Sequence, residues 1–110
     1  MTTIIIRKTN TDAYDSFICM GHAEYAKAGQ KDILCSAISV LVINTINSLE
    51  ELTGAKMEVS TNEETGFIHC SFVNPLNEKQ ILLMDSMVFG LQNLKKEYGK
   101  KYLEVRFEEV

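Results

Sequence analysis

The sequence predicts an α+β fold, a single domain over residues 1–110 in which a mixed, mostly antiparallel sheet of about five strands packs with two long helices. Two long stretches, residues 32–53 and 77–98, repeat apolar residues at the three- and four-residue spacing of a helix. Five shorter stretches are continuously apolar or alternate between apolar and polar residues, as strands do. Their order along the chain gives β-β-α-β-β-α-β. A length of 110 residues suits one domain with a modest core.

The first two strands are predicted at residues 2–8 and 14–21, joined by a turn at residues 10–12. The centre of the second strand, Phe17-Ile18-Cys19-Met20, is apolar at every position. A strand of that kind is usually covered on both faces. We therefore expect the two helices to lie on opposite sides of the sheet, or one sheet face to be buried in a dimer.

Residues 32–53 are predicted to form the first helix. Asp32 suits the N-cap, because its carboxylate accepts hydrogen bonds from the free N–H groups of the first turn, and Gly54 suits the C-terminal end. Polar residues interrupt the uncharged run from 33 to 49, so we interpret it as a buried helix of a soluble protein and not as a membrane span. The side that faces the core carries these residues: Leu34, Ile38, Leu41, Thr45 and Leu49.

The second half of the chain repeats the pattern. Residues 56–60 and 66–73 are predicted to form a hairpin around a turn at 61–64. The second helix begins after Asn77, with Gln80 three residues later as in a capping box. The last strand, residues 102–108, alternates apolar and charged side chains, which predicts one face toward the core and one toward water.

Acidic residues outnumber basic ones by fifteen to eleven, a formal net charge of −4. That balance is a poor electrostatic match for nucleic acid, so we expect no nucleic-acid partner, and we expect no membrane partner either. It would suit a basic protein substrate, although mild acidity also simply keeps a protein soluble.

The three cysteines are an odd number without paired spacing, and no C-x-x-C pair occurs. We therefore expect no disulfide framework, no zinc site, no other cofactor and a reducing, cytoplasmic compartment. Cys19 and Cys70 are predicted to be core residues. His69 adjoins Cys70, but neighbours on a strand point to opposite faces, so these two cannot pair.

The third cysteine has a different setting. Cys35 falls about one turn inside the first helix, and His22 ends the second strand before the loop that leads to that helix. The positive end of the helix dipole favours a thiolate there, and the loop can bring the imidazole over the same helix terminus. A thiol and an imidazole placed together are the parts of a nucleophile–base pair. The alternative is that Cys35 is a small packing residue.

The region around these two residues carries a short set of specific residues and motifs: Gly21-His22-Ala23, Gly29, Asp32-Ile33-Leu34-Cys35 and Ser39. With these residues the chain resembles the ribosomal-processing cysteine protease (Prp) family, and the resemblance extends over its whole length. The resemblance implies that His22 is the base and Cys35 the nucleophile of a catalytic dyad. It also implies the substrate, which is the basic N-terminal extension of large-subunit ribosomal protein twenty-seven, cut just after a pair of aromatic residues.

Three further residues are candidates for a supporting role in this site. Asp32 either caps the helix or orients His22 as the third member of a triad, and the two roles can coexist. Ser39 lies on the same helical face as Cys35 and either bonds back to a helix carbonyl or contacts substrate. Gly21 allows unusual torsions or close approach of the backbone. Free N–H groups at the helix start, including that of Cys35, are candidates for the oxyanion hole.

The loop from Glu24 to Lys31 contains Tyr25 and Gly29 and is long enough to cover Cys35. We interpret it as a substrate loop that is ordered by substrate, although a simple connector has the same composition.

Two other functions remain open to the sequence. One is a non-enzymatic ribosome-assembly or interaction module in which Cys35 is structural, and the other is a thiol redox sensor. We also expect a homodimer, because the core is modest, the second helix is rich in methionine, and the family that the chain resembles forms dimers.

Overall fold

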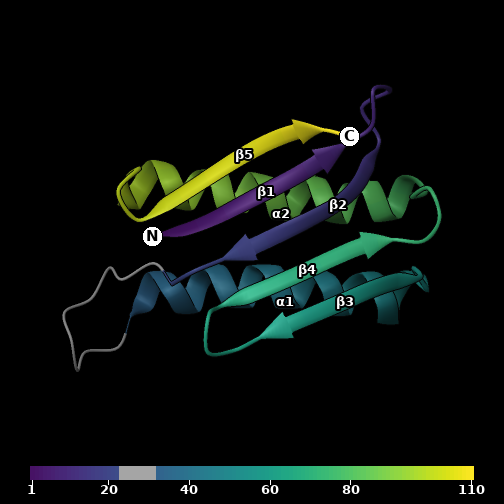
Figure 1. The fold of residues 1–110 in the computed structure, drawn as a ribbon. Coiled ribbons are helices and arrows are strands. Elements are labelled where there is room, and N and C mark those ends of the chain that lie inside the picture. The colour runs from purple at the N-terminus through teal and green to yellow at the C-terminus, as the bar shows by residue number, and fades with distance from the viewer. Residues whose placement is uncertain (23–31) are drawn as a thin grey trace.

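The computed structural model describes residues 1–22 and 32–110. Within these ranges five strands form one sheet and two helices pack against it (Figure 1). The predicted order β-β-α-β-β-α-β is confirmed. The elements have these bounds: β1 (Thr2–Lys8), β2 (Tyr14–Met20), α1 (Ile33–Thr53), β3 (Met57–Asn62), β4 (Phe67–Phe72), α2 (Glu78–Tyr98) and β5 (Leu103–Glu109).

The sheet is mixed and mostly antiparallel, as expected. Its spatial order is β3-β4-β2-β1-β5, so β3 and β5 are the edge strands. The pairs β1–β2, β2–β4 and β3–β4 are antiparallel, and only β1–β5 is parallel among the described strands. This order places the β3–β4 hairpin beside the end of β2, so segments far apart in the sequence meet at that end of the sheet (Figure 1).

Both helices lie on the same face of the sheet, so the expectation that they cover opposite faces is wrong (Figure 1). Ile4, Ile6 and Phe17 point toward the helices and join one core with them. Ile5 points to the other face, yet only 5 % of it is exposed. It lies opposite Ile18 on β2 and Arg106 on β5, and such cross-strand neighbours can shield a central residue without a second layer.

The helix ends are formed by the residues that the sequence indicates. Asp32 Oδ1 accepts a hydrogen bond from Cys35 N at 2.9 Å, and Gly54 ends α1 with a left-handed φ of 69°. Asn77 and Gln80 form the complete capping box of α2. At the N-terminal ends of both helices, side-chain oxygens accept hydrogen bonds from backbone N–H groups that the helix itself leaves unpaired.

The turn of the second hairpin lies two residues later than predicted. β3 continues to Asn62, and residues 63–66 form the turn. Gly66 has a φ of 67°, a conformation that glycine adopts without strain, and Asn62 Oδ1 accepts from Glu64 N at 3.1 Å. The glycine therefore fixes the end of the turn, and the acidic pair Glu63-Glu64 lies inside it.

Within the described residues, α1 is the one helix whose length and mean hydropathy of 1.6 would suffice to cross a membrane. One face of α1 lies in the core, where Leu34, Val42 and Leu49 are fully buried. On α2, Met84 and Met87 are also buried, so these two methionines fill the core and do not contribute to an exposed apolar surface.

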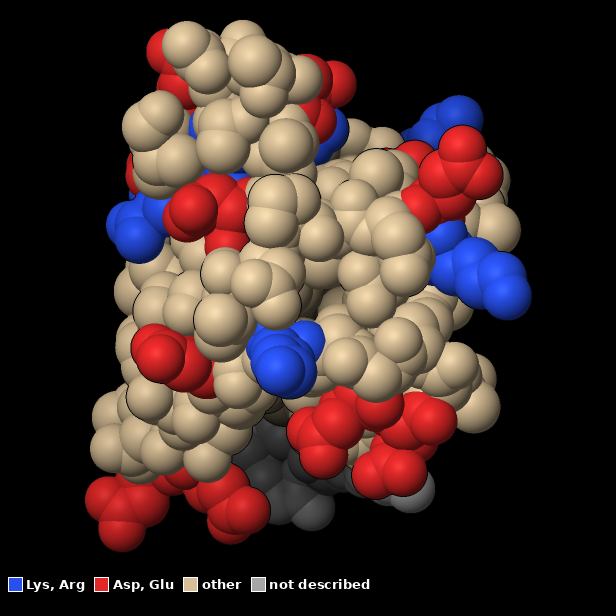
Figure 2. All heavy atoms as spheres, turned by 90° about the vertical axis from the view of Figure 1, so that its right-hand side faces the viewer, with Lys and Arg blue, Asp and Glu red and all other residues tan. Residues whose placement is uncertain are grey.

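The charges visible on one end of the molecule are interspersed. Figure 2 looks at the end where α1 finishes and α2 begins, and acidic side chains lie at several places around its margin with basic ones between them. No continuous basic patch is visible on this face. The charges on this face therefore do not form a patch of one sign.

Candidate active site

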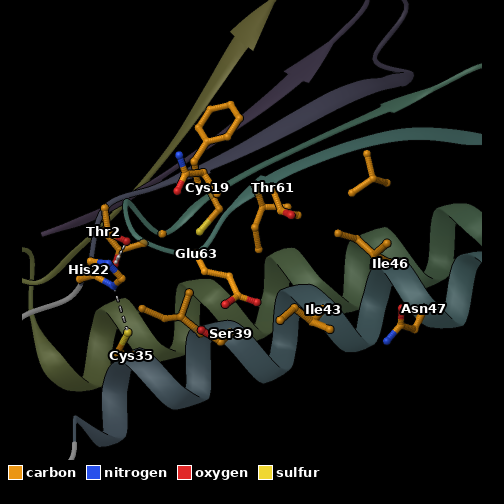
Figure 3. A pocket seen from close by; sticks show the side chains of 17 residues that line it. Thr2, Cys19, His22, Cys35, Ser39, Ile43, Ile46, Asn47, Thr61 and Glu63 are labelled. Carbon is orange, nitrogen blue, oxygen red and sulfur yellow. Dashed lines mark hydrogen bonds between the residues drawn. The ribbon is translucent and has the colours of Figure 1, made fainter.

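A groove of about 480 Å³ runs between α1 and the β3–β4 hairpin (Figure 3). Its walls are mainly apolar and come from elements that are distant in the sequence. Ile38, Ile43 and Ile46 belong to α1, while Val59 and Ile68 come from the hairpin. Concave apolar surface with a few polar groups is typical of a ligand site.

Cys35 lies at one end of this groove. It is half-buried, one residue away from the core stripe of α1 that includes Leu34 and Ile38. Its thiol therefore borders the groove without being enclosed by the core. The position in the first turn of α1 places the sulfur near the positive end of the helix dipole, as the sequence indicates.

His22 and the residue before it are both held by the turn that joins β3 and β4. Gly21 N donates a hydrogen bond to Thr65 O at 3.2 Å, and His22 Nε2 lies 3.2 Å from Glu64 O. A carbonyl oxygen can only accept, so the proton of the neutral imidazole belongs on Nε2. Nδ1 is then the unprotonated nitrogen, which is the form of the ring that can act as a base.

That nitrogen faces the thiol. Cys35 Sγ and His22 Nδ1 are 3.9 Å apart, and the two side chains point toward one another (Figure 3). The distance is long for a hydrogen bond to sulfur, and free active sites often show such loose geometry. A modest closure would let the thiol proton pass to Nδ1. The structure thus brings together the two residues that the sequence singles out.

Asp32 acts as a helix cap. Its Oδ1 accepts from Cys35 N, and both ring nitrogens of His22 already face other groups, Glu64 O and Cys35 Sγ. The group beside His22 Nε2 is therefore a backbone carbonyl. Cys35 N is engaged with Asp32, so that N–H is not free for an oxyanion as the sequence suggested.

The remaining predicted residues differ in how the structure places them. Ser39 borders the groove one turn beyond Cys35, and its hydroxyl makes no hydrogen bond with another described residue (Figure 3). Gly21 has a φ of 81°, in agreement with the expected unusual torsion. Tyr25 and Gly29 lie outside the described residues.

Sequence reasoning missed the contribution of the turn at residues 63–66. Glu64 O lies beside the imidazole of His22, and the Glu63 side chain lies over α1 near Ser39 and Ile43 (Figure 3). Backbone carbonyls leave no mark in side-chain chemistry, so Glu64 could not be recognised in this role. The available signal was Gly66, because a glycine that closes a turn often marks close approach of another segment.

Gly66→Ala tests that close approach. An added Cβ would lie 2.4 Å from Gly21 O and 3.1 Å from His22 Cε1, so the turn and the base must move apart. Because small misplacement of a catalytic group can cost about 100-fold, we expect kcat/KM to fall by about that factor. Peptide cleavage and thermal unfolding of the purified variant measure the two effects separately.

Gly54→Ala is the matched control. Gly54 also has a positive φ, 69°, but nothing lies within 4 Å of the added Cβ. Both variants should lose about 1 kcal/mol of stability from the strained torsion, while only Gly66→Ala should lose activity. Equal activity of the two variants would contradict the proposed role of the turn.

The other two thiols are poor nucleophiles. Burial raises the pKa of Cys19 to about 11, with a smaller contribution from Cys35, and raises the pKa of Cys70 to about 12. At neutral pH both remain protonated. No group of three or more His, Cys, Asp or Glu side chains that could hold a metal ion occurs among the described residues. The described site therefore offers thiol and imidazole chemistry.

A thiol beside an oriented imidazole, at the end of an apolar groove on an α+β scaffold, defines the class of cysteine peptidases. The comparison with known families agrees with that class. Residues 1–103 match the family described as cysteine protease Prp, and the chain belongs to this family. It is accordingly a cysteine protease.

Two relatives illustrate the similarity. The ribosomal processing cysteine protease Prp of Bacillus subtilis (strain 168) is 26% identical over 102 residues, which cover 89% of this chain and 90% of the relative. The protein of the same name from Staphylococcus aureus (strain Mu50) is 25% identical over 100 residues, which cover 91% of this chain and 93% of the relative.

Solved structures share the fold. The S. aureus ribosomal processing protease Prp with a covalently linked product peptide superimposes with a TM-score of 0.89 at 23% identity, over 98% of this chain and 100% of that one. The same protease with a substrate peptide gives a TM-score of 0.82 at 23% identity, over 100% of both chains. The architecture described above is therefore the Prp architecture.

Proposed function

We propose that this protein is an endopeptidase that removes the N-terminal extension of large-subunit ribosomal protein twenty-seven, with Cys35 as nucleophile and His22 as base. The observation that carries the proposal is the arrangement of the imidazole. Nε2 is held by Glu64 O, and Nδ1 faces Cys35 Sγ. This arrangement fixes the tautomer that can accept the thiol proton.

The chemical steps follow from that arrangement. The thiol proton passes to His22 Nδ1 as Sγ attacks the scissile carbonyl carbon, so a C–S bond forms. The imidazolium then gives the proton to the leaving amine nitrogen as the C–N bond breaks, which leaves a thioester on Cys35. Water then gives a proton to the same nitrogen as its oxygen attacks the thioester carbonyl carbon, so a C–O bond forms and the C–S bond breaks. The imidazolium returns its proton to the departing thiolate, and the product leaves as a carboxylic acid, which ionises in water.

The groove supports a protein substrate with apolar and basic residues. Its walls are mainly apolar, and Glu63 places a carboxylate over α1 near Ser39 (Figure 3). No ion pair joins Glu63 to another described residue. A carboxylate in that position favours a cationic substrate segment over an acidic one, in keeping with a basic ribosomal protein.

The named relatives support the same substrate class. The curated relatives are called ribosomal processing cysteine proteases, and the S. aureus protein has been solved with a substrate peptide and with a covalently linked product peptide. The non-enzymatic alternative loses its basis, since the chain belongs to a protease family. Three free cysteines agree with a reducing, cytoplasmic location, which is part of the proposal.

The direct test is cleavage of the ribosomal protein twenty-seven encoded in the same genome. The purified protease and the full-length ribosomal protein are mixed, and the new N-terminus is identified by mass spectrometry. We expect a single cut just after a pair of aromatic residues. An intact ribosomal protein, with the protease shown to be folded, would refute this substrate.

We also propose a homodimer, joined through the outward face of the two helices. Val40, Leu82 and Phe89 are each about two-thirds exposed, at 67%, 68% and 67%. Val40 and Phe89 flank the point where Leu41 lies against Gly90, so they belong to one helix–helix surface. Exposed apolar residues that gather on one surface are typical of an interface.

Sedimentation equilibrium at micromolar concentration should give twice the 12.4 kDa mass of the chain. Phe89→Ser should shift the protein toward monomer, while Val73→Ser, which replaces an exposed residue after β4, should not. A monomeric wild-type protein would refute the dimer, and an unshifted Phe89→Ser dimer would refute this interface.

A further inference from the structure

The free edge of β3 borders the groove. β3 is an edge strand of the sheet, and among the described strands it pairs only with β4. One further hydrogen bond, from Val73 N to Lys56 O at 3.0 Å, continues the pairing of β3 with β4 beyond the ends of the two strands. In an antiparallel ladder, alternate residues turn both backbone groups to the neighbouring strand. Residues 58, 60 and 62 therefore face β4, and residues 57, 59 and 61 face outward.

Two of these outward residues also line the groove. Val59 and Thr61 direct their side chains into it, while their N–H and C=O groups point to the open edge. Val59 is 42% exposed, and no hydrogen bond from another described element covers the edge here. An unpaired strand edge is a ready template for a further strand.

The length of the groove suits an extended peptide. Its helical wall runs from Cys35 through Ser39 and Ile43 to Asn47, one turn at a time (Figure 3). Twelve residues of helix rise about 18 Å. An extended chain advances about 3.3 Å per residue, so roughly five substrate residues fit between Asn47 and the thiol.

We infer that the peptide substrate binds as an added strand on β3, in the groove that ends at Cys35. Its backbone pairs with the outward groups of Val59 and Thr61. Every second substrate side chain then points down onto Ile43 and Ile46, and the others point to solvent. Backbone pairing supplies affinity, and the alternate apolar contacts supply specificity. This inference rests on the proposed protease function.

The alternation gives a test with a peptide that the protease cleaves. The probe spans the cleavage site of ribosomal protein twenty-seven, and each of its backbone N–H groups is methylated in turn. Loss of a hydrogen bond costs about 1 kcal/mol, so kcat/KM should fall about fivefold or more at alternate positions and stay within about twofold between them. Losses at consecutive positions, or at none, would overturn strand addition.

A pair of protease variants tests the same strand edge by changing the protease and not the peptide. Val59→Pro removes the outward N–H, and Val59→Ala removes only the side chain. Proline is tolerated at an edge position whose N–H is unused, so both should fold. Val59→Pro should cleave the probe about fivefold more slowly than Val59→Ala. Equal kcat/KM values would contradict the inference.

Hydrogen exchange separates this inference from the proposed function. The amides of Val59 and Thr61 are followed by NMR in the Cys35→Ala protein, with and without saturating probe. Strand addition predicts slower exchange at both amides when the peptide is bound. Saturable binding without that slowing contradicts strand addition alone. Absence of both binding and cleavage contradicts the proposed substrate, and the inference fails with it.

Discussion

Cys35→Ala is expected to abolish peptide cleavage, with a fall in kcat of at least about 10⁴-fold. The other thiol of the groove is a poor replacement for the nucleophile. Cys19 lies in the same groove, but burial raises the pKa of its thiol to about 11, so it stays protonated at neutral pH. Cleavage of the ribosomal-protein peptide, followed by mass spectrometry, measures the loss.

The fold should survive this substitution. Cys35 is only half-buried, and the cap that starts α1 uses its backbone N–H and not its thiol. The melting temperature should therefore change by less than about 5 °C. Cys19→Ala is the matched control, which removes a buried sulfur and should keep most of the activity. Turnover by the Cys35→Ala protein would eliminate the thiol mechanism.

His22→Ala is expected to lower kcat by about 10²- to 10⁴-fold, the usual contribution of a general base. Cys35 should remain alkylatable, but more slowly at neutral pH, because no imidazolium favours its thiolate. Iodoacetamide reports on Cys35 selectively in the folded protein, since burial raises the pKa of Cys19 to about 11 and of Cys70 to about 12.

His69→Ala is the matched control for the base. His69 is the other histidine of the chain and lies on β4, opposite Ile18 and Ser60. It does not border the groove. Its replacement should leave both cleavage and the pH profile of alkylation unchanged. If His22→Ala also leaves the pH profile of Cys35 alkylation unchanged, the imidazole and the thiol do not interact.

Local rules predicted most of the fold. Caps and apolar periodicity located both helices, because Asp32, Gly54 and Asn77 act on their own neighbours. The layer arrangement was not predictable in the same way. An apolar strand such as β2 can be shielded by cross-strand neighbours, as Ile5 is by Ile18, so apolar character alone does not specify a second layer of helices.

The proximity of His22 and Cys35 was predictable, but the support of the imidazole was not. His22 and Cys35 stood out by residue type and by their places at a strand end and a helix start. The support comes from two backbone carbonyls: Glu64 O lies beside the imidazole, and Thr65 O accepts from Gly21 N. Both carbonyls are about forty residues away in sequence, and the sheet order brings them near. Residue types carry no record of such contacts.

The turn at residues 63–66 has a consequence for how this protein can evolve. Surface hairpin turns usually accept insertions and deletions, because little depends on their exact length. Here one added residue would displace the Glu64 carbonyl by about 3.3 Å relative to the imidazole. The ring would then lose the partner that selects its reactive tautomer. Natural homologues should therefore keep the residue count of this turn and its closing glycine, Gly66, while the side chains of residues 64 and 65 vary.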